Sequence, residues 1–328
     1  MKRFKRSTVI LHAAFTTAAV SLSFPVAAQT YPTKSIRLVV PWPAGGVTDV
    51  VARIVGERLS QGLGQSIIID NKAGATGFIG TEFVAKATPD GYTLLLITAS
   101  THAISPNLFK KVPYDPIKDF ETISQLTTAP TILVTYAAFP AGSVAELVKL
   151  AKAKPGALNY ASFGNGSSAH LAAELFKQAT GTDFVHIPYK GAAPAIADLM
   201  GGQVTIFFDS IPSALPHVRS GKLKGLAVTG RTRTTAAPDI PTVAETYPGF
   251  EVTVWQGFGA PAGTPRAVIN RLNAELVKVM TMPDVRERLV NLGADPLSTT
   301  PQEFAAHIAR EKDKWASVVK TSGITISD

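Results

Sequence analysis

The chain has 328 residues, of which 45% are hydrophobic and 17% are charged, so it is long enough for two domains and too apolar to be disordered. It contains no cysteine, which excludes disulfides, thiol catalysis, Cys-based metal sites and a lipid anchor on a cysteine. The formal net charge is +8, but four of the 32 basic residues lie within residues 1–28, where no acidic residue occurs. The remainder has 28 basic and 24 acidic residues, a net charge of +4. Because no cluster of Lys and Arg with interleaved aromatic residues remains, we expect no nucleic-acid binding.

Residues 1–28 have the pattern of a cleavable secretory signal peptide. Lys2, Arg3, Lys5 and Arg6 precede an apolar run from residue 8 to about residue 24, and small residues end the segment at Ala28. A membrane anchor is the competing interpretation, but the run is short and no second apolar span of about 20 residues follows it. We therefore expect cleavage after Ala28 and a freely soluble protein in the periplasm of a Gram-negative bacterium.

The first half of the remaining chain alternates strands and helices. Strands are predicted at 35–40, 66–70 and 92–98, and helices follow the glycine-containing turns at 41–49 and 72–77. Strands that alternate with helices indicate a parallel sheet covered on both faces.

The second half repeats this pattern about 125 residues later. Strands are predicted at 158–162, 183–187 and 204–208, with glycine turns and helices between them. Two long strands, 120–134 and 250–258, are predicted to bridge the halves, and residues 265 to about 320 are predicted to be mostly helical. We therefore expect an α/β fold with two similar domains, the first discontinuous at 29–128 and 253–328 and the second at 129–252.

Each half places a glycine turn where a strand ends and a helix begins. Ligands bind at the carboxyl ends of strands in open α/β sheets. The first helical turn has unpaired backbone N–H groups, and the helix dipole adds partial positive charge there. Two such helix ends facing each other across a cleft would hold an organic anion without arginine.

The sequence GNGSSA at residues 164–169 fits the pattern G-x-G-x-x-A, which has three interpretations. A dinucleotide site requires an acidic residue at the end of the next strand, and none lies at 186–190. A small-anion site is favoured over a purely structural turn. A hydrolase that uses Ser168, His170 and Asp209 is an alternative, but G-x-S-x-G is absent and the spacing gives it no support.

Several candidate residues have a structural alternative. One of Ser167 and Ser168 is expected to cap a helix, while the other donates a hydroxyl to the ligand. Asp49 either caps its helix or contacts ligand or water. Trp42 and Phe163 either pack under the turns or stack on the ligand. The six histidines have no metal-binding spacing.

Six motifs together resemble the Bug family, the extracytoplasmic solute receptors of tripartite tricarboxylate transporters. They are VPWPAGGVTD at 40–49, NKAGATGFIG at 71–80, PDGY at 89–92, YASFGNGSSAHL at 160–171, HIPYKG at 186–191 and SGKLKGLAV at 220–228, with the whole chain after the leader covered. The resemblance departs from the usual spelling at Lys72-Ala73, where the family often has Arg-Pro.

The resemblance implies a two-domain Venus flytrap, a type II-like periplasmic binding protein, that closes on a small carboxylate held by backbone groups, hydroxyls and waters. By motif, the implied ligand-binding residues are Trp42, Gly45, Gly46, Asp49, Ala75, Thr76, Ser100, Thr101, Phe163, Ser167, Ser168, His170, Tyr189 and Asp209. We expect a monomer without catalytic residues, cofactor or metal that delivers a small organic acid, a di- or aromatic carboxylate, to transporter membrane subunits. A secreted Ser/His hydrolase and a solute sensor for a membrane kinase are the rival functions, and the identity of the ligand stays open.

Overall fold

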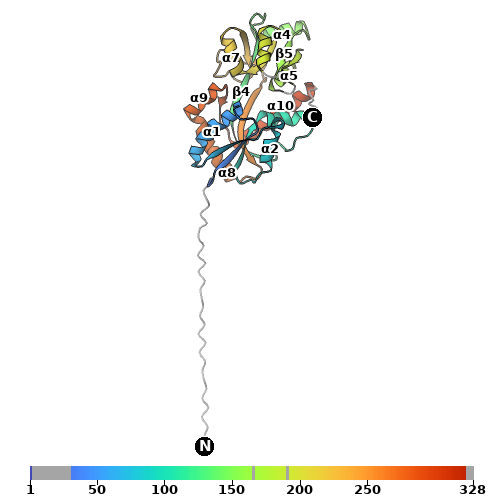
Figure 1. Cartoon of the computed structure of the whole chain (residues 1–328). Coiled ribbons are helices and arrows are strands. Elements are labelled where there is room, and N and C mark those ends of the chain that lie inside the picture. Colours follow the sequence, from blue (N-terminus) through green and yellow to red (C-terminus); the bar gives the residue numbers. More distant parts are fainter. Residues whose placement is uncertain (2–30, 165–166, 190–191, 323–328) are drawn as a thin grey trace. The chain divides into compact units, whose positions relative to one another are not determined.

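The computed structural model describes Met1 and residues 31–164, 167–189 and 192–322. The predicted signal peptide lies almost entirely outside these residues. No helix among the described residues has the length and apolar character needed to cross a membrane. One compact unit runs from Tyr31 to the C-terminus and contains two α/β lobes (Figure 1).

The sheet of the first lobe has the order β2-β1-β3-β9-β4. Its strands are β1 (Ile36–Val40), β2 (Ile67–Asn71), β3 (Thr93–Thr98), β9 (Thr253–Pro261) and the lower half of β4 (Phe120–Tyr136), with the short β10 (Asp295–Pro296) also paired to β4. Strands β1, β2 and β3 are parallel, and β9 is antiparallel to its neighbours. The carboxyl ends of β1, β2 and β3 therefore meet at one edge of the lobe.

Alternate residues of β1 enter two different hydrophobic clusters, as a strand buried on both faces requires. Ile36, Leu38 and Val40 pack with helices α1 (Val47–Leu63), α8 (Arg266–Thr281) and α9 (Pro283–Asn291). Val39 faces the other cluster, which contains residues of α2 (Phe78–Ala85), α3 (Ser105–Leu108) and α10 (Pro301–Ser322). The sheet is thus covered on both faces, as the sequence predicted.

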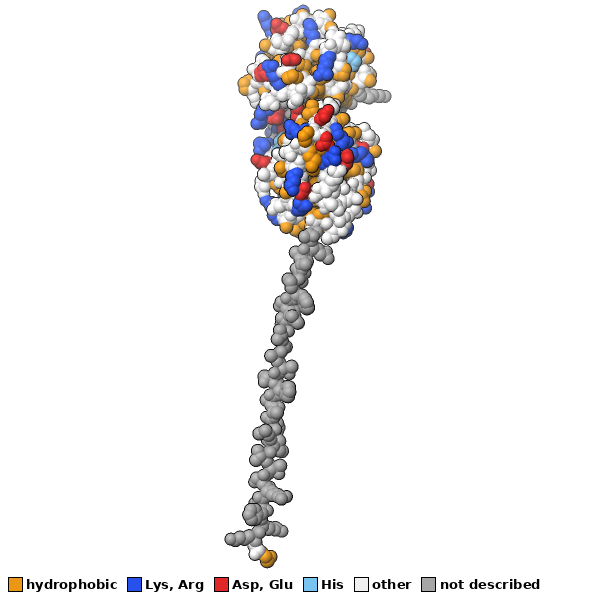
Figure 2. All heavy atoms as spheres, turned by 90° about the vertical axis from the view of Figure 1, so that its left-hand side faces the viewer, with side chains coloured by type: hydrophobic (Ala, Val, Ile, Leu, Met, Phe, Trp, Pro, Cys, Tyr) orange, Lys and Arg blue, Asp and Glu red, His pale blue; other side chains and the backbone are white. Residues whose placement is uncertain are grey.

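Ion pairs join α1 to α9 at the surface. Arg58 contacts Asp284 at 2.7 Å, and Arg288 contacts Glu57 at 3.1 Å. Figure 2 shows the corresponding side of the molecule, where basic and acidic side chains lie interspersed with hydrophobic ones.

The second lobe repeats the architecture, with the strand order β6-β5-β7-β4 and β8 on the other edge of β4. Its strands are β5 (Asn159–Ser162), β6 (Val185–Pro188), β7 (Ile206–Ser210), β8 (Leu223–Val228) and the upper half of β4. Its helices are α4 (Val144–Ala153), α5 (Ser168–Thr180), α6 (Ala192–Met200) and α7 (Ile211–Arg219). The repeated strand–turn–helix pattern of the sequence is therefore a repeat in space.

The 17-residue strand β4 belongs to both lobes (Figure 1). It pairs with β9 as far as Pro130↔Thr253 and with β7 from Thr131↔Ser210 onward. The chain thus passes between the lobes at Pro130–Thr131 and again at Val252–Thr253. The predicted bridging strand at 120–134 is confirmed. The second predicted bridge, 250–258, is strand only from Thr253, and that strand pairs with β3 and the first half of β4, within the first lobe. The boundaries at 128/129 and 252/253 stay a prediction.

Strand β7 differs from its predicted extent. The sequence predicted a strand at 204–208 followed by Asp209, but β7 runs from Ile206 to Ser210. Antiparallel pairing of Ile132 with Asp209 and of Thr131 with Ser210 extends the strand. Asp209 therefore lies inside the sheet and not in the turn after it.

Candidate functional site

The turn after β1 leads into a helix whose N-terminus has no side-chain cap. The N-cap residue of α1 is Gly46, and Val50 makes the first intrahelical bond, to the Gly46 carbonyl at 3.0 Å. Among the described residues, no acceptor takes the N–H groups of Val47 and Thr48. A helix start of this kind attracts an anion through its unpaired N–H groups and its dipole.

Asp49 organises this turn from within. Its Oδ2 accepts the Gly45 N–H at 2.8 Å and the Arg53 Nε–H at 2.9 Å, and its Oδ1 accepts the Asn71 amide at 3.0 Å. The hydrogen bond from Arg53, helped by those from Gly45 and Asn71, lowers the pKa of Asp49 to about 2. The Asp49 side chain is buried and both of its oxygens accept hydrogen bonds from the protein, which favours a structural role over contact with ligand or water.

Asn71, the last residue of β2, was not predicted as a site residue. Besides Asp49, its amide donates to the Trp42 carbonyl at 3.1 Å and so ties the first turn to the second strand. An asparagine at the end of a strand carries no distinctive signal in a sequence. Only the pairing of β1 with β2 brings it to this turn.

The second turn contains two non-glycine residues in a left-handed conformation, Ala75 (φ 45°) and Thr76 (φ 55°), and both are exposed. Such conformations cost about 1–3 kcal/mol each and cluster at ligand sites. A Cβ added at Gly77 would lie 2.7 Å from Thr101 Cγ2 and 3.5 Å from Trp42 Cζ2. The turns after β1, β2 and β3 therefore pack directly against one another, which brings the predicted residues of the first lobe together.

The third turn supplies Ser100, which is partly buried, and Thr101, which is fully buried. The Thr101 hydroxyl lies within hydrogen-bond distance of the Thr98 carbonyl (3.2 Å) and of His102 Nδ1 (2.9 Å). Burial lowers the pKa of His102 to about 3, so this imidazole is neutral. Thr101 thus supports the turn, and Ser100 is the more accessible of the two hydroxyls.

In the second lobe, the prediction that one serine caps α5 is confirmed for Ser167. Its hydroxyl accepts the His170 N–H at 3.3 Å and donates to the Gly164 carbonyl at 2.7 Å. Ser168 is the first helical residue, is partly buried, and its hydroxyl takes part in no hydrogen bond among the described residues. The start of α5 is therefore self-capped, whereas that of α1 is not.

Beneath this turn His170 stacks on His186, with ring centroids 4.0 Å apart and planes 12° apart. His186 Nε2 lies 2.6 Å from the Ser162 hydroxyl, and Tyr160 stacks on His186 at 4.8 Å. Burial, with a contribution from His186, lowers the pKa of His170 to about 4. His186 was not predicted as a site residue. It reaches His170 through the pairing of β5 with β6, and no local sequence pattern indicates that pairing.

The remaining predicted residues of this lobe lie around the same strands. Phe163 packs edge-on against Phe207 at 5.2 Å, and the Tyr189 hydroxyl donates to Asp198 at 2.8 Å. Asp209 is fully buried; its Oδ1 accepts the Ser210 N–H at 2.7 Å, and its Oδ2 has no hydrogen-bond partner among the described residues. Burial raises the pKa of Asp209, and the neighbouring Ser213 hydroxyl offsets part of this rise without reaching hydrogen-bond geometry.

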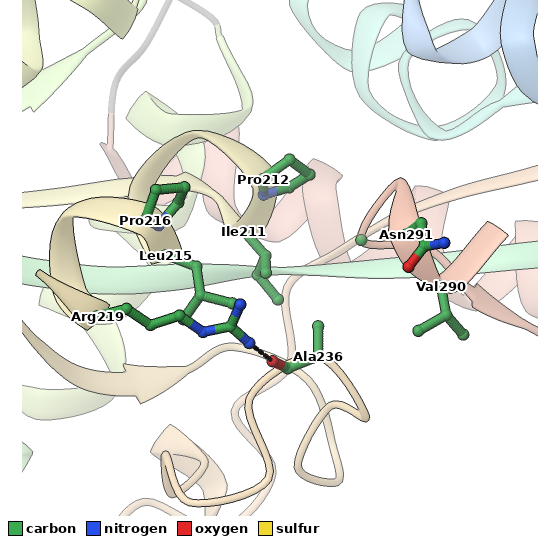
Figure 3. A pocket seen from close by; sticks show the side chains of 9 residues that line it. Ile211, Pro212, Leu215, Pro216, Arg219, Ala236, Val290 and Asn291 are labelled. Atoms are coloured by element: carbon green, nitrogen blue, oxygen red, sulfur yellow. Dashed lines mark hydrogen bonds between the residues drawn. The ribbon is translucent and has the colours of Figure 1, made fainter. Parts of the chain in front are cut away.

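The described residues include no group of three His, Asp or Glu side chains arranged to hold a metal ion. Among these residues no hydrogen bond joins Ser168 to Asp209, whose Oδ1 accepts the Ser210 N–H. A groove of about 290 Å³ between α7 and α9 lies elsewhere, lined by Ile211, Pro212 and Leu215 on one side and by Val290 and Asn291 on the other (Figure 3). None of the predicted ligand-binding residues lines this groove.

A model of the family described as "Tripartite tricarboxylate transporter family receptor" matches residues 51–324. The chain belongs to this family. The receptor is 39% identical over 308 residues to the protein BugT of Bordetella pertussis, with 93% of this chain and 94% of the relative covered. It is 38% identical over 293 residues to a protein of Pseudomonas sp. strain P51, with 89% and 87% covered.

Solved structures give the same result for the fold. The receptor is 42% identical to a structure described as a periplasmic transporter, with a TM-score of 0.73 and 90% and 100% of the two chains covered. An adipate-bound protein of R. palustris is 37% identical (TM-score 0.74, 90% and 99% covered), and MatC of Rhodopseudomonas palustris with bound malate is 35% identical (TM-score 0.70, 88% and 100% covered). The predicted two-domain periplasmic binding protein fold and the resemblance to the Bug family are thus confirmed, and these relatives are solute-binding receptors.

Proposed function

We propose that the receptor captures a small organic carboxylate in the periplasm and delivers it to the membrane subunits of a tripartite tricarboxylate transporter. The leader-like segment at residues 1–28 supports export, and the family supports the transporter partner. The protein acts in this proposal as a monomer and changes no covalent bond.

The observation that carries the proposal is the uncapped start of α1 among the three packed turns of the first lobe. A carboxylate placed there gains about 0.3–1 kcal/mol from the helix end, and up to about 2 kcal/mol in a partly buried site. The nearby guanidinium of Arg53 is already engaged by Asp49. The negative charge is therefore held mainly by peptide N–H groups and by hydroxyls such as that of Ser100.

The two lobes contribute differently to this site. Ser167 already caps α5 in the second lobe, so α1 is the stronger anion cradle. Both helix ends were expected to hold the anion; we now propose that the helix end of the first lobe holds the carboxylate. The second lobe then contacts the rest of the ligand through Phe163, Ser168 and Tyr189.

Two similar receptors support a dicarboxylate, since their structures carry adipate and malate. Trp42 and Phe163 each pack against the hydrophobic cluster of their lobe but are only partly buried, so an aromatic acid is also compatible with the site. Binding shifts the equilibrium between open and closed lobes by the difference in ligand affinity for the two forms. The membrane subunits then recognise the closed form.

A thermal-unfolding screen tests the proposal with adipate, malate, benzoate and the neutral diamide of adipate. A ligand at 100 times its Kd adds about 2.7 kcal/mol to the free energy of unfolding, which raises Tm measurably. We expect at least one carboxylate to raise Tm and the diamide to leave it unchanged. Stabilisation by the diamide equal to that by adipate would refute an anion site, and covalent labelling of Ser168 by an activated ester would refute the receptor role.

A further inference from the structure

One buried hydroxyl touches both places where the chain passes between the lobes. Thr229 follows β8 at the end of the second lobe and has no exposed surface. Its Oγ1 donates to the Val252 carbonyl at 2.6 Å and accepts the Thr131 N–H at 2.8 Å. Val252 immediately precedes β9, and Thr131 is the point at which β4 exchanges its partner β9 for β7.

Further bonds enclose this hydroxyl. The Thr131 and Thr229 hydroxyls lie 2.9 Å apart, the Thr229 N–H donates to the Thr131 carbonyl at 2.9 Å, and the Val252 N–H donates to the Thr229 carbonyl at 2.9 Å. A buried polar network in which every member is bonded rigidifies its surroundings. Thr229 Oγ1 lies within hydrogen-bond distance of two carbonyls, those of Val252 (2.6 Å) and Thr131 (3.1 Å). The Val252 carbonyl is the closer acceptor, so the hydroxyl donates to one crossing segment and accepts from the other.

We propose that the Thr229 hydroxyl holds the two hinge segments together and so fixes the hinge about which the lobes rotate. Any rotation of one lobe against the other must twist the chain at Pro130–Thr131 and at Val252–Thr253 together. Because Thr229 joins these two segments, it restricts the rotation to one axis and narrows the range of lobe orientations. This inference rests on the proposed function only in assuming that the lobes move to enclose a ligand.

The chain offers a matched control on the same strand. Thr135 is also fully buried in β4, and its Oγ1 donates to the Thr205 carbonyl at 2.6 Å, but both residues belong to the second lobe. Thr229→Val and Thr135→Val thus remove the same group and a bond of the same length. Only the first substitution releases a contact between the two crossings.

The experiment measures the distribution of distances between the lobes in the full chain without ligand. Spin labels are attached to cysteines introduced at the exposed positions Lys149 in α4 and Asn270 in α8; the natural chain has no cysteine that would react. Double electron–electron resonance should give a broader distribution for Thr229→Val than for the parent. Thr135→Val and the hydroxyl-retaining Thr229→Ser should match the parent, and Thr131→Val should be intermediate.

Distance distributions of equal width for Thr229→Val and Thr135→Val would overturn the inference. If Thr229→Val does not fold, the distance distributions of Thr131→Val and Thr135→Val are compared instead, and equal widths would again overturn the inference. Adipate, added in a second series, should bind Thr229→Val several-fold more weakly than Thr135→Val. A parent protein that binds no carboxylate would contradict the proposed function alone, since the comparison of widths needs no ligand.

Discussion

His170 and His186 stack face to face, with ring centroids 4.0 Å apart, beneath the glycine turn of the second lobe. Burial lowers the pKa of both imidazoles, and the proximity of His186 lowers that of His170 further. Glu174 raises both pKa values slightly, and Lys177, which forms an ion pair with Glu174 at 3.0 Å, lowers them. The neutral pair is therefore the stable form in the fold.

This pair predicts a loss of stability in mild acid. The pKa of His170 is about 4 in the folded state and about 6.5 in an unfolded chain, so the unfolded state binds more protons between these values. The free energy of unfolding should fall by about 1–3 kcal/mol as the pH decreases from 6.5 to 4. Urea unfolding at several pH values measures this slope. It should be shallower in His170→Gln, and an unchanged slope would show that the stack is not its source.

A self-capping substitution at Gly46 should separate stability from binding. Gly46 has φ −74° and ψ 165°, which suits a serine N-cap, and an added Cβ would meet only the Pro43 carbonyl at 3.6 Å. Gly46→Ser should stabilise the protein by about a few tenths of a kcal/mol, because its hydroxyl accepts an N–H of the first turn while glycine is already a tolerated N-cap residue. The same bond competes with a ligand carboxylate, so the affinity measured by calorimetry should fall several-fold. Gly46→Ala, which cannot cap, is the control; equal affinities for the two variants would contradict an anion site at α1.

Asp49→Asn should weaken binding although Asp49 is proposed to hold the turn and not the ligand. The change removes the anionic acceptor shared by Gly45 and Arg53 and should cost about 1–3 kcal/mol of stability. Because the turn loses its fixed shape, the affinity for a carboxylate should fall about tenfold. Glu245→Gln is the control, since Glu245 also pairs with an arginine (Arg233) and accepts a backbone N–H (Thr242), but outside the site. An affinity loss in both variants would indicate general destabilisation.

Glu311 of α10 should be essential for stability. Its buried Oε2 lies 3.3 Å from the indole nitrogens of both Trp255 and Trp315, and its Oε1 bonds Lys314. Glu311→Leu leaves two buried indole N–H groups without an acceptor and should lower the free energy of unfolding by about 2–4 kcal/mol. Glu311→Gln keeps one acceptor and should cost about half as much. Urea unfolding followed by tryptophan fluorescence measures both, and a loss below 1 kcal/mol in Glu311→Leu would contradict this role.

The sequence predicted the parts of the fold that depend on local pattern. The buried strand at 36–40 and the glycine turn at 41–46 are visible as an apolar run and a breaker, and the repetition of this pattern indicated two lobes. That one of Ser167 and Ser168 caps α5 was also predicted, because serine is a preferred N-cap residue, and the structure shows that the cap is Ser167.

Contacts that depend on strand pairing could not be predicted in the same way. Asn71 reaches Trp42 across 29 residues, and His186 reaches Ser162 across 24, through parallel pairing whose register no local pattern specifies. The end of β7 was misplaced for a similar reason, since its last two residues are strand only because they pair with Ile132 and Thr131. Thr229 meets Thr131 at a separation of 98 residues, and nothing in its own surroundings indicates that contact.

Strand β4 supplies hydrogen bonds to β9 and β10 in one lobe and to β7 and β8 in the other. If either half of the protein were produced by itself, its sheet would lack either this shared strand or the partners of half of it. Isolated halves should therefore be poorly folded, and the intact chain should melt in one cooperative step in spite of its two lobes. Evolution of the two halves is constrained accordingly, because a change in the length or twist of this strand affects both sheets at once.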